Sequence, residues 1–425
     1  MSNMLWTRRQ TIQGLAALAP HLWIQSASAK GRLEKTRLKI GFVPVTDCAP
    51  LVIAQEKGFF RQNGLEVELS REASWATVRD GVIQGRLDAS HSVLATPLYV
   101  TVGAGGAQPT PLVALMSLDL NGSGITFSKQ LWQSGVRTGA DLAKYLKSGH
   151  SLTAASSFPA SMVHYMLYYY LAHYGIDPNR DLRVVTVPPP QMVSNMKSGS
   201  IDLYSIGEPW NARAVFDGVG FTALASRDFW CGHPEKVLMA TAAWAAANPN
   251  THKAVVKSLI QACQYCDQPG NRLEVANLTA GSSYTNANPL YARASMLGTY
   301  NYGGFDDQGN TIRNVRAVSD FNVFYKTANT RYLSGDNHGT YLWKSHGMWL
   351  LTQMVRWGQL RALPKNAEQI LDRVYLTQTY REAAEELGIR SPKVDYKPES
   401  GFLDHRTFDA GNPVAYIKNF DIKKV

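Results

Sequence analysis

The sequence of 425 residues predicts a two-lobe α/β fold, in which each lobe is a mostly parallel sheet flanked by helices. The main observation is a repeated order of segments. Residues 67–93 and 187–210 each contain a strand-like start, a helical segment, a Gly three residues before an Asp, and another apolar stretch. Strands that alternate with helices at this spacing are typical of βαβ units. The composition, 45% hydrophobic and 18% charged, is that of a globular protein with a large core.

The first lobe is expected to open with a strand at 38–43, followed by a helix that ends at Gly64. A strand at 65–69, a helix from about Ser74 and a strand from Ala89 follow. The apolar run VALMSL continues this pattern, and LNGSGITFS begins to depart from it. This part of the chain therefore predicts one parallel sheet.

The same order begins again at residue 150. The strand HSLTAA precedes the helix ASMVHYMLYYYLAHYG, and the strand LRVVTV, the helix PPPQMVSNMKSG and the strand IDLYSI follow. After Trp230 the pattern is helical, and these helices are expected to pack back on the first lobe. We therefore assign lobe I to 30–149 and 227–425, and lobe II to 150–226.

Two parallel sheets joined by crossing segments leave a crevice at the carboxyl ends of their strands, where ligands usually bind. The helix N-termini on both sides direct free N–H groups into that crevice, which suits a small anion. Without residues 1–29 the formal net charge falls from +10 to +8, and a mild positive field also favours anions. The basic residues are scattered among acids, so nucleic-acid binding is not predicted.

Residues 1–29 have the pattern of a twin-arginine-like export signal. Arg8 and Arg9 precede the uncharged stretch 12–24, and Ala27-Ser28-Ala29 provides the small residues of a cleavage site. Thr11 stands where the twin-arginine pattern prefers Phe, and a frayed helix is the alternative. The remaining chain has no apolar run of about 18 residues, so an exported, soluble, periplasmic protein is predicted.

The sequence lacks the motifs of an enzyme. It contains no dinucleotide-binding loop, no haem attachment motif, no nucleophile elbow and no His/Cys set with metal-ligand spacing. The pair Cys263 and Cys266 lies in a helical pattern, where packing explains it better than a metal or redox site. No cofactor and no metal are therefore predicted, although many twin-arginine substrates are cofactor-loaded oxidoreductases.

Six sequence motifs, in the same order, carry a resemblance to a known family. They are DCAPLVIAQEKGFF, SWATVRDG, FPASMVHYMLYYYLAHYGIDP, VVTVPPPQMVSNMKSGSIDLYSIGEPWNA, HPEK and KSHGMWLLTQMVRWG. The chain resembles the solute-binding proteins of nitrate and bicarbonate ABC transporters and the related cytoplasmic nitrate sensors. The resemblance covers about 38–420 and implies a type II periplasmic-binding-protein fold.

The resemblance also implies a binding site. Its nitrate-binding members use a Trp, a Gln, a His and a Lys, of which this chain keeps Trp75 and Lys236. The Gln position corresponds to Ser123 and the His position to Val163, beside His164. Two of the four binding residues of the nitrate-binding members are therefore replaced in this chain. Because adjacent helical residues point about 100° apart, a structural or rim role is expected for His164, and a slipped helix that turns it inward as a ligand-binding residue is the alternative.

The residue types fit an anion site. Trp75 follows Ser74, a good N-cap, so the indole and the N–H groups of Ala76 and Thr77 are expected to face the crevice together. Lys236 offers a compact positive charge with three donors. Glu208, in the motif GEPW, either lines the cleft or serves as an N-cap or hinge residue.

The predicted function is capture of nitrate or nitrite for an ABC permease of the inner membrane by a monomeric protein. A four-atom ligand gains at most about 6 kcal/mol of binding free energy. Unless water, Ser123 or His164 compensates for the lost Gln and His, the affinity should fall or the ligand should change. The bicarbonate-binding relatives have an acidic residue with a bound calcium ion near this Lys position. The Lys236 of this chain argues against calcium and favours a simple anion. Cyanate and a small organic acid stay open, as does a cytoplasmic sensor of the same fold.

Overall fold

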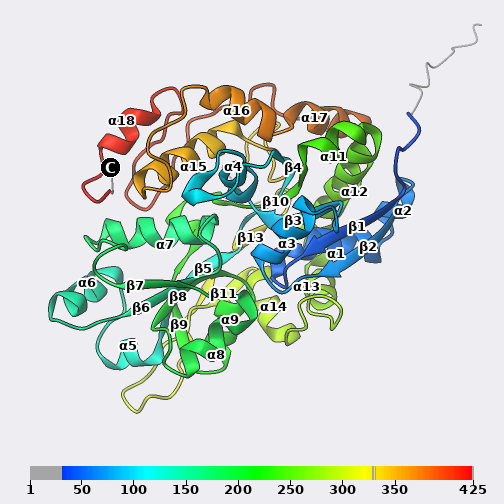
Figure 1. Ribbon diagram of the computed structural model, residues 1–425. Coiled ribbons are helices and arrows are strands. Elements are labelled where there is room, and N and C mark those ends of the chain that lie inside the picture. Colours follow the sequence, from blue (N-terminus) through cyan, green and yellow to red (C-terminus); the bar gives the residue numbers. More distant parts are fainter. Residues whose placement is uncertain (1–30, 328–329, 331, 424–425) are drawn as a thin grey trace, which may run out of the picture. The chain divides into compact units, whose positions relative to one another are not determined.

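The structure is a computed structural model that describes residues 31–327, 330 and 332–423 (Figure 1). The predicted export signal at 1–29 therefore lies outside the described residues. From Leu33 onward the chain forms one compact unit, which contains two large sheets. We call the first sheet with its helices lobe I and the second sheet with its helices lobe II.

The sheet of lobe I has six strands in the order β13-β4-β10-β3-β1-β2. Their bounds are β1 Arg37–Phe42, β2 Glu66–Arg71, β3 Ala89–Val93, β4 Leu112–Asn121, β10 Pro234–Thr241 and β13 Asn322–Val323. Strand β1 pairs in parallel with β2 and β3, while β10 lies antiparallel between β3 and β4. The late strand β10 therefore enters the centre of the first sheet.

The sheet of lobe II has five strands in the order β7-β6-β8-β5-β9. Their bounds are β5 Ser123–Ser128, β6 Thr153–Ser156, β7 Arg183–Thr186, β8 Leu203–Gly207 and β9 Gly220–Ala225. Strand β6 pairs in parallel with β7 and β8, and β5 is antiparallel to β8 and β9. The two-lobe α/β fold predicted from the sequence is confirmed, with antiparallel strands added to each sheet.

The predicted start of lobe II at residue 150 is too late, because β5 already belongs to the second sheet. The chain leaves lobe I at Asn121 and Gly122, which have φ of 64° and 78°. These two left-handed residues join β4 directly to β5, so LNGSGITFS departs from the pattern of the first lobe because the chain passes there into the second sheet. A second crossing, which includes α10 (Ser226–Phe229), joins β9 to β10.

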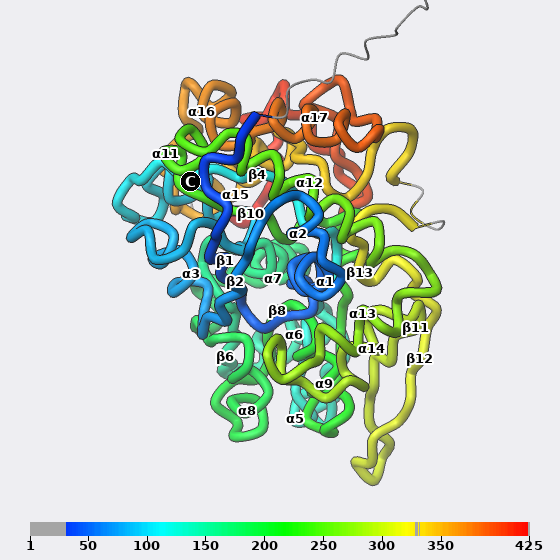
Figure 2. Tube along the Cα trace, turned by 90° about the vertical axis from the view of Figure 1, so that its right-hand side faces the viewer, coloured from blue at the N-terminus to red at the C-terminus, as the bar shows by residue number. Residues whose placement is uncertain are grey.

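Helices cover both sheets (Figures 1 and 2). In lobe II they are α5 Lys129–Gln133, α6 Gly139–Lys147, α7 Met162–His173, α8 Met192–Lys197 and α9 Trp210–Phe216. Before β10, lobe I contains α1 Ala49–Glu56, α2 Phe59–Gln62, α3 Trp75–Ile83 and α4 Ala95–Thr101; after β10 it contains α11 Ala242–Ala247, α12 Pro249–Asp267, α13 Arg272–Thr279, α14 Pro289–Met296, α15 Lys344–Arg356, α16 Ala367–Val374, α17 Thr377–Glu386 and α18 Pro413–Lys418. Beside α14 lies a hairpin of β11 (Thr299–Asn301) and β12 (Val315–Ala317).

The later helices pack mainly on lobe I. Helix α12 contacts α1 and β4, and α15 and α16 contact α4. Both views place α16 and α17 at the end of the unit that holds the first sheet, opposite α5 and α8 (Figures 1 and 2). Cys263 and Cys266 are buried in α12 as free thiols within the core of lobe I.

The two lobes share an apolar cluster. Val45 and Trp75 of lobe I pack with Met192, Tyr204 and Trp210 of lobe II, together with other buried side chains. The indole N–H of Trp210 donates to the carbonyl of Pro44 at 3.1 Å. The lobes are therefore in contact at the carboxyl ends of their central strands.

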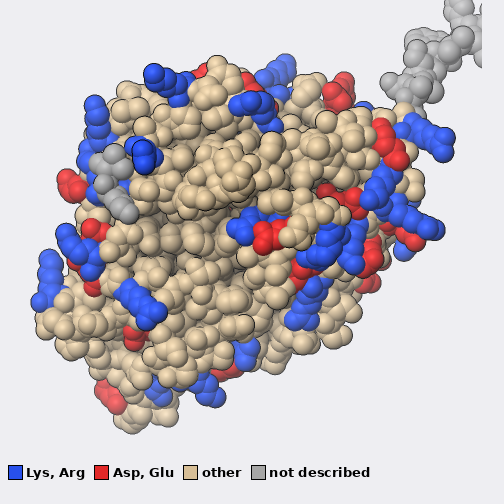
Figure 3. All heavy atoms as spheres, in the orientation of Figure 1, with Lys and Arg blue, Asp and Glu red and all other residues tan. Residues whose placement is uncertain are grey.

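Charged side chains of both signs are interspersed on the face shown in Figure 3. Within the described residues, every helix is too short or too polar to cross a bilayer.

Candidate functional site

Trp75 and Lys236 lie next to each other where the two lobes meet. Trp75 is the first residue of α3, and Lys236 lies in β10, paired with Val93 of β3 and Asp119 of β4. The Lys236 Nζ lies 5.6 Å from the centroid of the Trp75 ring, and each residue is only 2% exposed. A cation held over an indole face in a desolvated site is attracted by the ring quadrupole.

Two carboxylates flank the Lys236 ammonium. The Nζ atom lies 2.5 Å from Asp47 Oδ2 and 2.6 Å from Glu235 Oε2. A histidine extends the row at each end: His91 Nε2 lies 3.0 Å from Asp47 Oδ1, and His233 Nδ1 lies 3.1 Å from Glu235 Oε1. All five side chains are buried. We call these five residues the charged row.

The charges of the row follow from its contacts. Burial opposes ionisation of Lys236, but Asp47 and Glu235 outweigh it and raise the pKa of the ammonium. Burial likewise acts to raise the pKa values of Asp47 and Glu235, yet the Lys236 charge holds both below their usual range. Burial lowers the pKa of His91, which keeps that ring neutral. The ammonium and its two carboxylates therefore sum to one negative charge.

Asp119 adds no further charge. Its carboxyl is buried beside the charged row, and burial followed by the Asp47 charge raises its pKa well above the usual range. Its Oδ1 accepts from the backbone N–H of Lys236 at 3.0 Å. A protonated Asp119 thus positions the backbone of β10 at the lysine.

The buried Trp75 Nε1 has no partner among the described residues, and the buried Ser157 Oγ likewise has none. Ser157 directly follows β6, at the carboxyl end of a central strand of lobe II. The amide of Ala76, in the first turn of α3, likewise has no acceptor within the described part of the chain. These groups are available to a ligand, since buried polar groups are otherwise almost always hydrogen-bonded.

The predicted role of the Thr77 amide is wrong. Ser74 and Thr77 form a capping box, in which the Ser74 Oγ accepts from the Thr77 N–H at 3.3 Å. The Thr77 Oγ1 in turn accepts from the Ser74 N–H at 3.1 Å. The cap therefore occupies this amide and fixes the first turn of α3, which holds Trp75 in place.

Ser123, the first residue of β5, supports the site from the first crossing between the lobes. Its hydroxyl donates to Glu235 Oε1 at 2.8 Å, and its N–H donates to the Ser226 Oγ at 3.1 Å. The second bond ties the two crossings between the lobes together. Because Glu235 holds Lys236, the Ser123 side chain orients the ammonium through the carboxylate.

His164 and Val163 lie on different faces of α7, as the helical geometry predicts. The His164 Nδ1 lies 2.9 Å from the Ser156 Oγ, and its ring centroid is 4.1 Å from that of Tyr168. Burial lowers the pKa of His164 to about 3, so the ring is neutral. Val163 packs in the large core cluster that includes Leu94 and Met348.

Glu208 joins the lobes and caps a helix. Its Oε2 accepts from the Ala212 N–H of α9 at 3.0 Å, and its Oε1 accepts from the Tyr300 hydroxyl at 2.6 Å. The Thr46 N–H donates to its carbonyl at 2.6 Å. Burial raises the pKa of this carboxyl to about 7. Glu208 therefore accepts from the first turn of α9, whose N-cap is Pro209, while its predicted hinge role stays a prediction.

Sequence analysis missed Asp47, His91, Glu235 and Ser157. Glu235 precedes Lys236 in the motif HPEK, whereas Asp47, in the motif DCAPL, comes beside Lys236 only through the fold, from a 3-10 helix far away in the sequence. Ser157 follows a predicted strand, and that position was the available signal.

Comparison with known proteins gives consistent relatives. Residues 31–280 match the NMT1-like family. The nitrate import ATP-binding protein NrtC of Synechocystis sp. is 40% identical over 94% of this chain, which spans 58% of the length of that relative. The nitrate/nitrite binding protein NrtA of Synechococcus elongatus is 33% identical, with 92% of this chain and 88% of that protein covered.

A bicarbonate relative and a solved structure agree with this. The bicarbonate-binding protein CmpA of Synechococcus sp. is 32% identical, with 94% of this chain and 90% of that protein covered. The crystal structure of the periplasmic nitrate-binding protein NrtA from Synechocystis matches with a TM-score of 0.83 and 31% identity, covering 92% of this chain and all of that one. The chain therefore belongs to the NMT1-like family and, as its motifs predicted, to the family of nitrate- and bicarbonate-binding solute-binding proteins.

Proposed function

We propose that the protein is a periplasmic solute-binding protein of an ABC transporter, which captures a small inorganic anion, nitrate or nitrite, between its two lobes. The observation that carries this proposal is the Lys236 ammonium over the Trp75 face in a buried site between the lobes. The relatives NrtA and CmpA are binding proteins by name, which supports a binding rather than a catalytic role.

A planar anion is proposed to lie at the Nε1 edge of the Trp75 ring, where the indole N–H has no other partner among the described residues. The Lys236 ammonium has three N–H donors, of which Asp47 and Glu235 engage two. The third donor, the indole N–H and the Ala76 amide would meet the anion oxygens. Because Lys236, Asp47 and Glu235 together already carry one negative charge, the hydrogen bonds from these donors and the enclosure of the site supply the binding free energy.

Bicarbonate is the second candidate, and the charged row favours it. Its hydroxyl needs an acceptor, and Asp47 and Glu235 provide carboxylate oxygens beside the ammonium. Nitrate has no hydroxyl and gains nothing from these oxygens. The ratio of the bicarbonate affinity to the nitrate affinity therefore measures whether a ligand hydroxyl donates a hydrogen bond to Asp47 or Glu235.

The cellular setting is also a proposal. Residues 1–29 would direct export, and a monomer in the periplasm would deliver the anion to a permease in the inner membrane. Fractionation of cells that express the full chain separates this from a cytoplasmic sensor: we expect processed protein in the periplasm. Unprocessed protein in the cytoplasm alone would favour the sensor.

Calorimetric titration of the mature chain with nitrate, nitrite, bicarbonate and cyanate tests the proposal. We expect one of the first three to bind with 1:1 stoichiometry. The variant Trp75→Phe, which keeps a ring but loses the indole N–H, should weaken that binding about tenfold, the effect of one buried hydrogen bond to a charged group. The matched control Trp132→Phe changes an indole in lobe II that packs on Phe221, and it should bind like the wild type. The proposal would be contradicted if none of the four anions gave a binding heat while a cooperative thermal melt showed that the protein is folded.

A further inference from the structure

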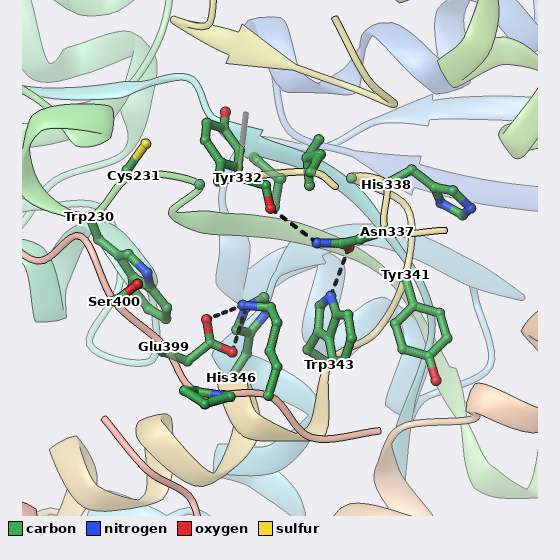
Figure 4. Close-up of a pocket in the computed structure, with 16 residues that line it drawn as sticks. Trp230, Cys231, Tyr332, Asn337, His338, Tyr341, Trp343, His346, Glu399 and Ser400 are labelled. Carbon is green, nitrogen blue, oxygen red and sulfur yellow. Dashed lines mark hydrogen bonds and ion pairs between the residues drawn. The ribbon is translucent and has the colours of Figure 1, made fainter. Parts of the chain in front are cut away.

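We propose a second ligand site in the cavity beside the two crossings between the lobes, which takes a flat, uncharged molecule with a hydrogen-bond acceptor. The cavity has a volume of about 180 Å³. Figure 4 shows Trp230 and Ser400 on one side, and Trp343 and Tyr341 on the other. Nothing in the function proposed above uses it.

The cavity touches both crossings. Leu120, which lines it, immediately precedes the first crossing at Asn121, and Trp230 to Gly232 belong to the second. The Tyr332 hydroxyl, from the wall of the cavity, lies 3.0 Å from the Asn121 Nδ2. Gly232 has φ of 81°, and a Cβ there would lie 2.8 Å from the Tyr332 ring, so only Gly allows this close approach.

The charges in the cavity cancel. Glu399 is 1% exposed, forms an ion pair with Lys397 and lies 3.3 Å from the His346 Nε2. The Ser345 hydroxyl donates to the same carboxylate at 2.5 Å. Both carboxylate oxygens are therefore occupied. Burial lowers the pKa of His346 and keeps its ring neutral, so the lining selects no net charge on a ligand.

Two hydrogen-bond donors in the cavity, the Trp230 indole N–H and the Lys397 ammonium, can still bind an acceptor, whereas the Glu399 oxygens already have partners. The indole N–H of Trp230, a residue only 1% exposed, has no acceptor among the described residues. Lys397 lies 5.4 Å from the centroid of the Trp343 ring, and Glu399 is its only partner within the described part of the chain. Free donors between aromatic faces select a flat ligand with an acceptor oxygen or nitrogen. An engineered cavity of about 150 Å³ binds benzene, so this one holds a single substituted ring.

The position of the cavity suggests regulation of the first site, a step that rests on the proposed function. Cys231 and Gly232 line the cavity, and the next residue, His233, pairs with Glu235. Glu235 holds Lys236. A ligand that fixes the second crossing therefore acts on the ammonium through two side chains, and by linkage the two ligands change each other's affinity equally.

Titration with benzamide, followed by ligand-detected NMR on the anion-free mature protein, tests the cavity by itself. Benzoate and benzylamine, of the same size but opposite charges, serve as comparators. We expect saturable binding with benzamide preferred over both. Lys397→Met and Trp230→Phe should each weaken it at least fivefold, while the exposed control Lys393→Met should not. Non-saturable benzamide signals, a preference for benzoate or benzylamine, or equal binding by Lys397→Met and Lys393→Met would overturn the proposal.

A second titration tests the coupling. The affinity for the anion identified by calorimetry is measured without and with saturating benzamide, and we expect at least a threefold difference. Equal affinities would refute the regulatory step alone, since the first titration already decides whether the cavity binds. If the wild-type protein bound no anion even without benzamide, the proposed function itself would be refuted.

Discussion

Lys236 is held by charges that the folded chain itself supplies. Asp47, Glu235 and the Trp75 ring surround the ammonium, and neither carboxylate was predicted from the sequence. The sequence identified the pair of residues that meet, because both lie in motifs shared with the family. It did not reveal that the lysine is already neutralised, because the neighbours come from η1 (Thr46–Cys48) and from the same strand.

Removal of the ammonium should destabilise the protein. Lys236→Met leaves two buried carboxylates unpaired, and loss of one partner of a buried ion pair costs about 3–5 kcal/mol in the free energy of unfolding. Urea unfolding of the variant measures this cost. In the double variant Asp47→Asn/Lys236→Met, the loss should be smaller than the sum of the single losses. Additive losses would show that the pair at 2.5 Å does not couple.

Glu208 should make stability depend on pH. Burial raises its pKa to about 7 in the folded chain, from an ordinary value of 4.5. An acid with a raised pKa in the folded state is most favourable below its unfolded pKa, so its contribution to stability falls as pH rises from about 4.5 to 7. Between pH 5 and pH 8, Glu208→Gln should therefore gain up to about 3 kcal/mol relative to the wild type. Urea titrations at both pH values measure it, and a parallel response of the two proteins would contradict this assignment.

At the scale of elements, strand β8 ends where it meets lobe I. Gly207, its last residue, stands opposite Asp47: a Cβ at this position would lie 3.3 Å from Asp47 Oδ2. The strand was predicted as part of a repeated β-α-β layout, with its end at Ile206. The contact was not, since it joins segments more than a hundred residues apart.

Gly207→Ala tests this contact. The added methyl group presses on the Asp47 carboxylate, so anion affinity should fall at least threefold with about 1 kcal/mol of lost stability. Gly270→Ala is the matched control, because a Cβ there meets no atom within 4 Å. Calorimetry and urea unfolding measure both effects, and equal behaviour of the two variants would show that β8 does not press on the site.

At the scale of the molecule, the sequence predicted two α/β lobes but placed the start of the second lobe at residue 150. The periodic helices and apolar strands carried the prediction, because burial sets their patterns locally. The order of strands in the sheets was not predictable in the same way. Strand β10 enters the first sheet from far along the chain, and β5 joins the second sheet directly after the left-handed residues Asn121 and Gly122.

A crystal structure of the mature chain with nitrate is the most direct measurement of the central claim, that Trp75 and Lys236 together hold a small anion between the lobes. We expect planar density at the Nε1 edge of the Trp75 ring, within hydrogen-bond distance of the Lys236 Nζ and the indole N–H. Bicarbonate density at the same place, with its hydroxyl on Asp47 or Glu235, would support the second candidate. An anion bound elsewhere, with Trp75 and Lys236 in contact only with each other, would contradict the account.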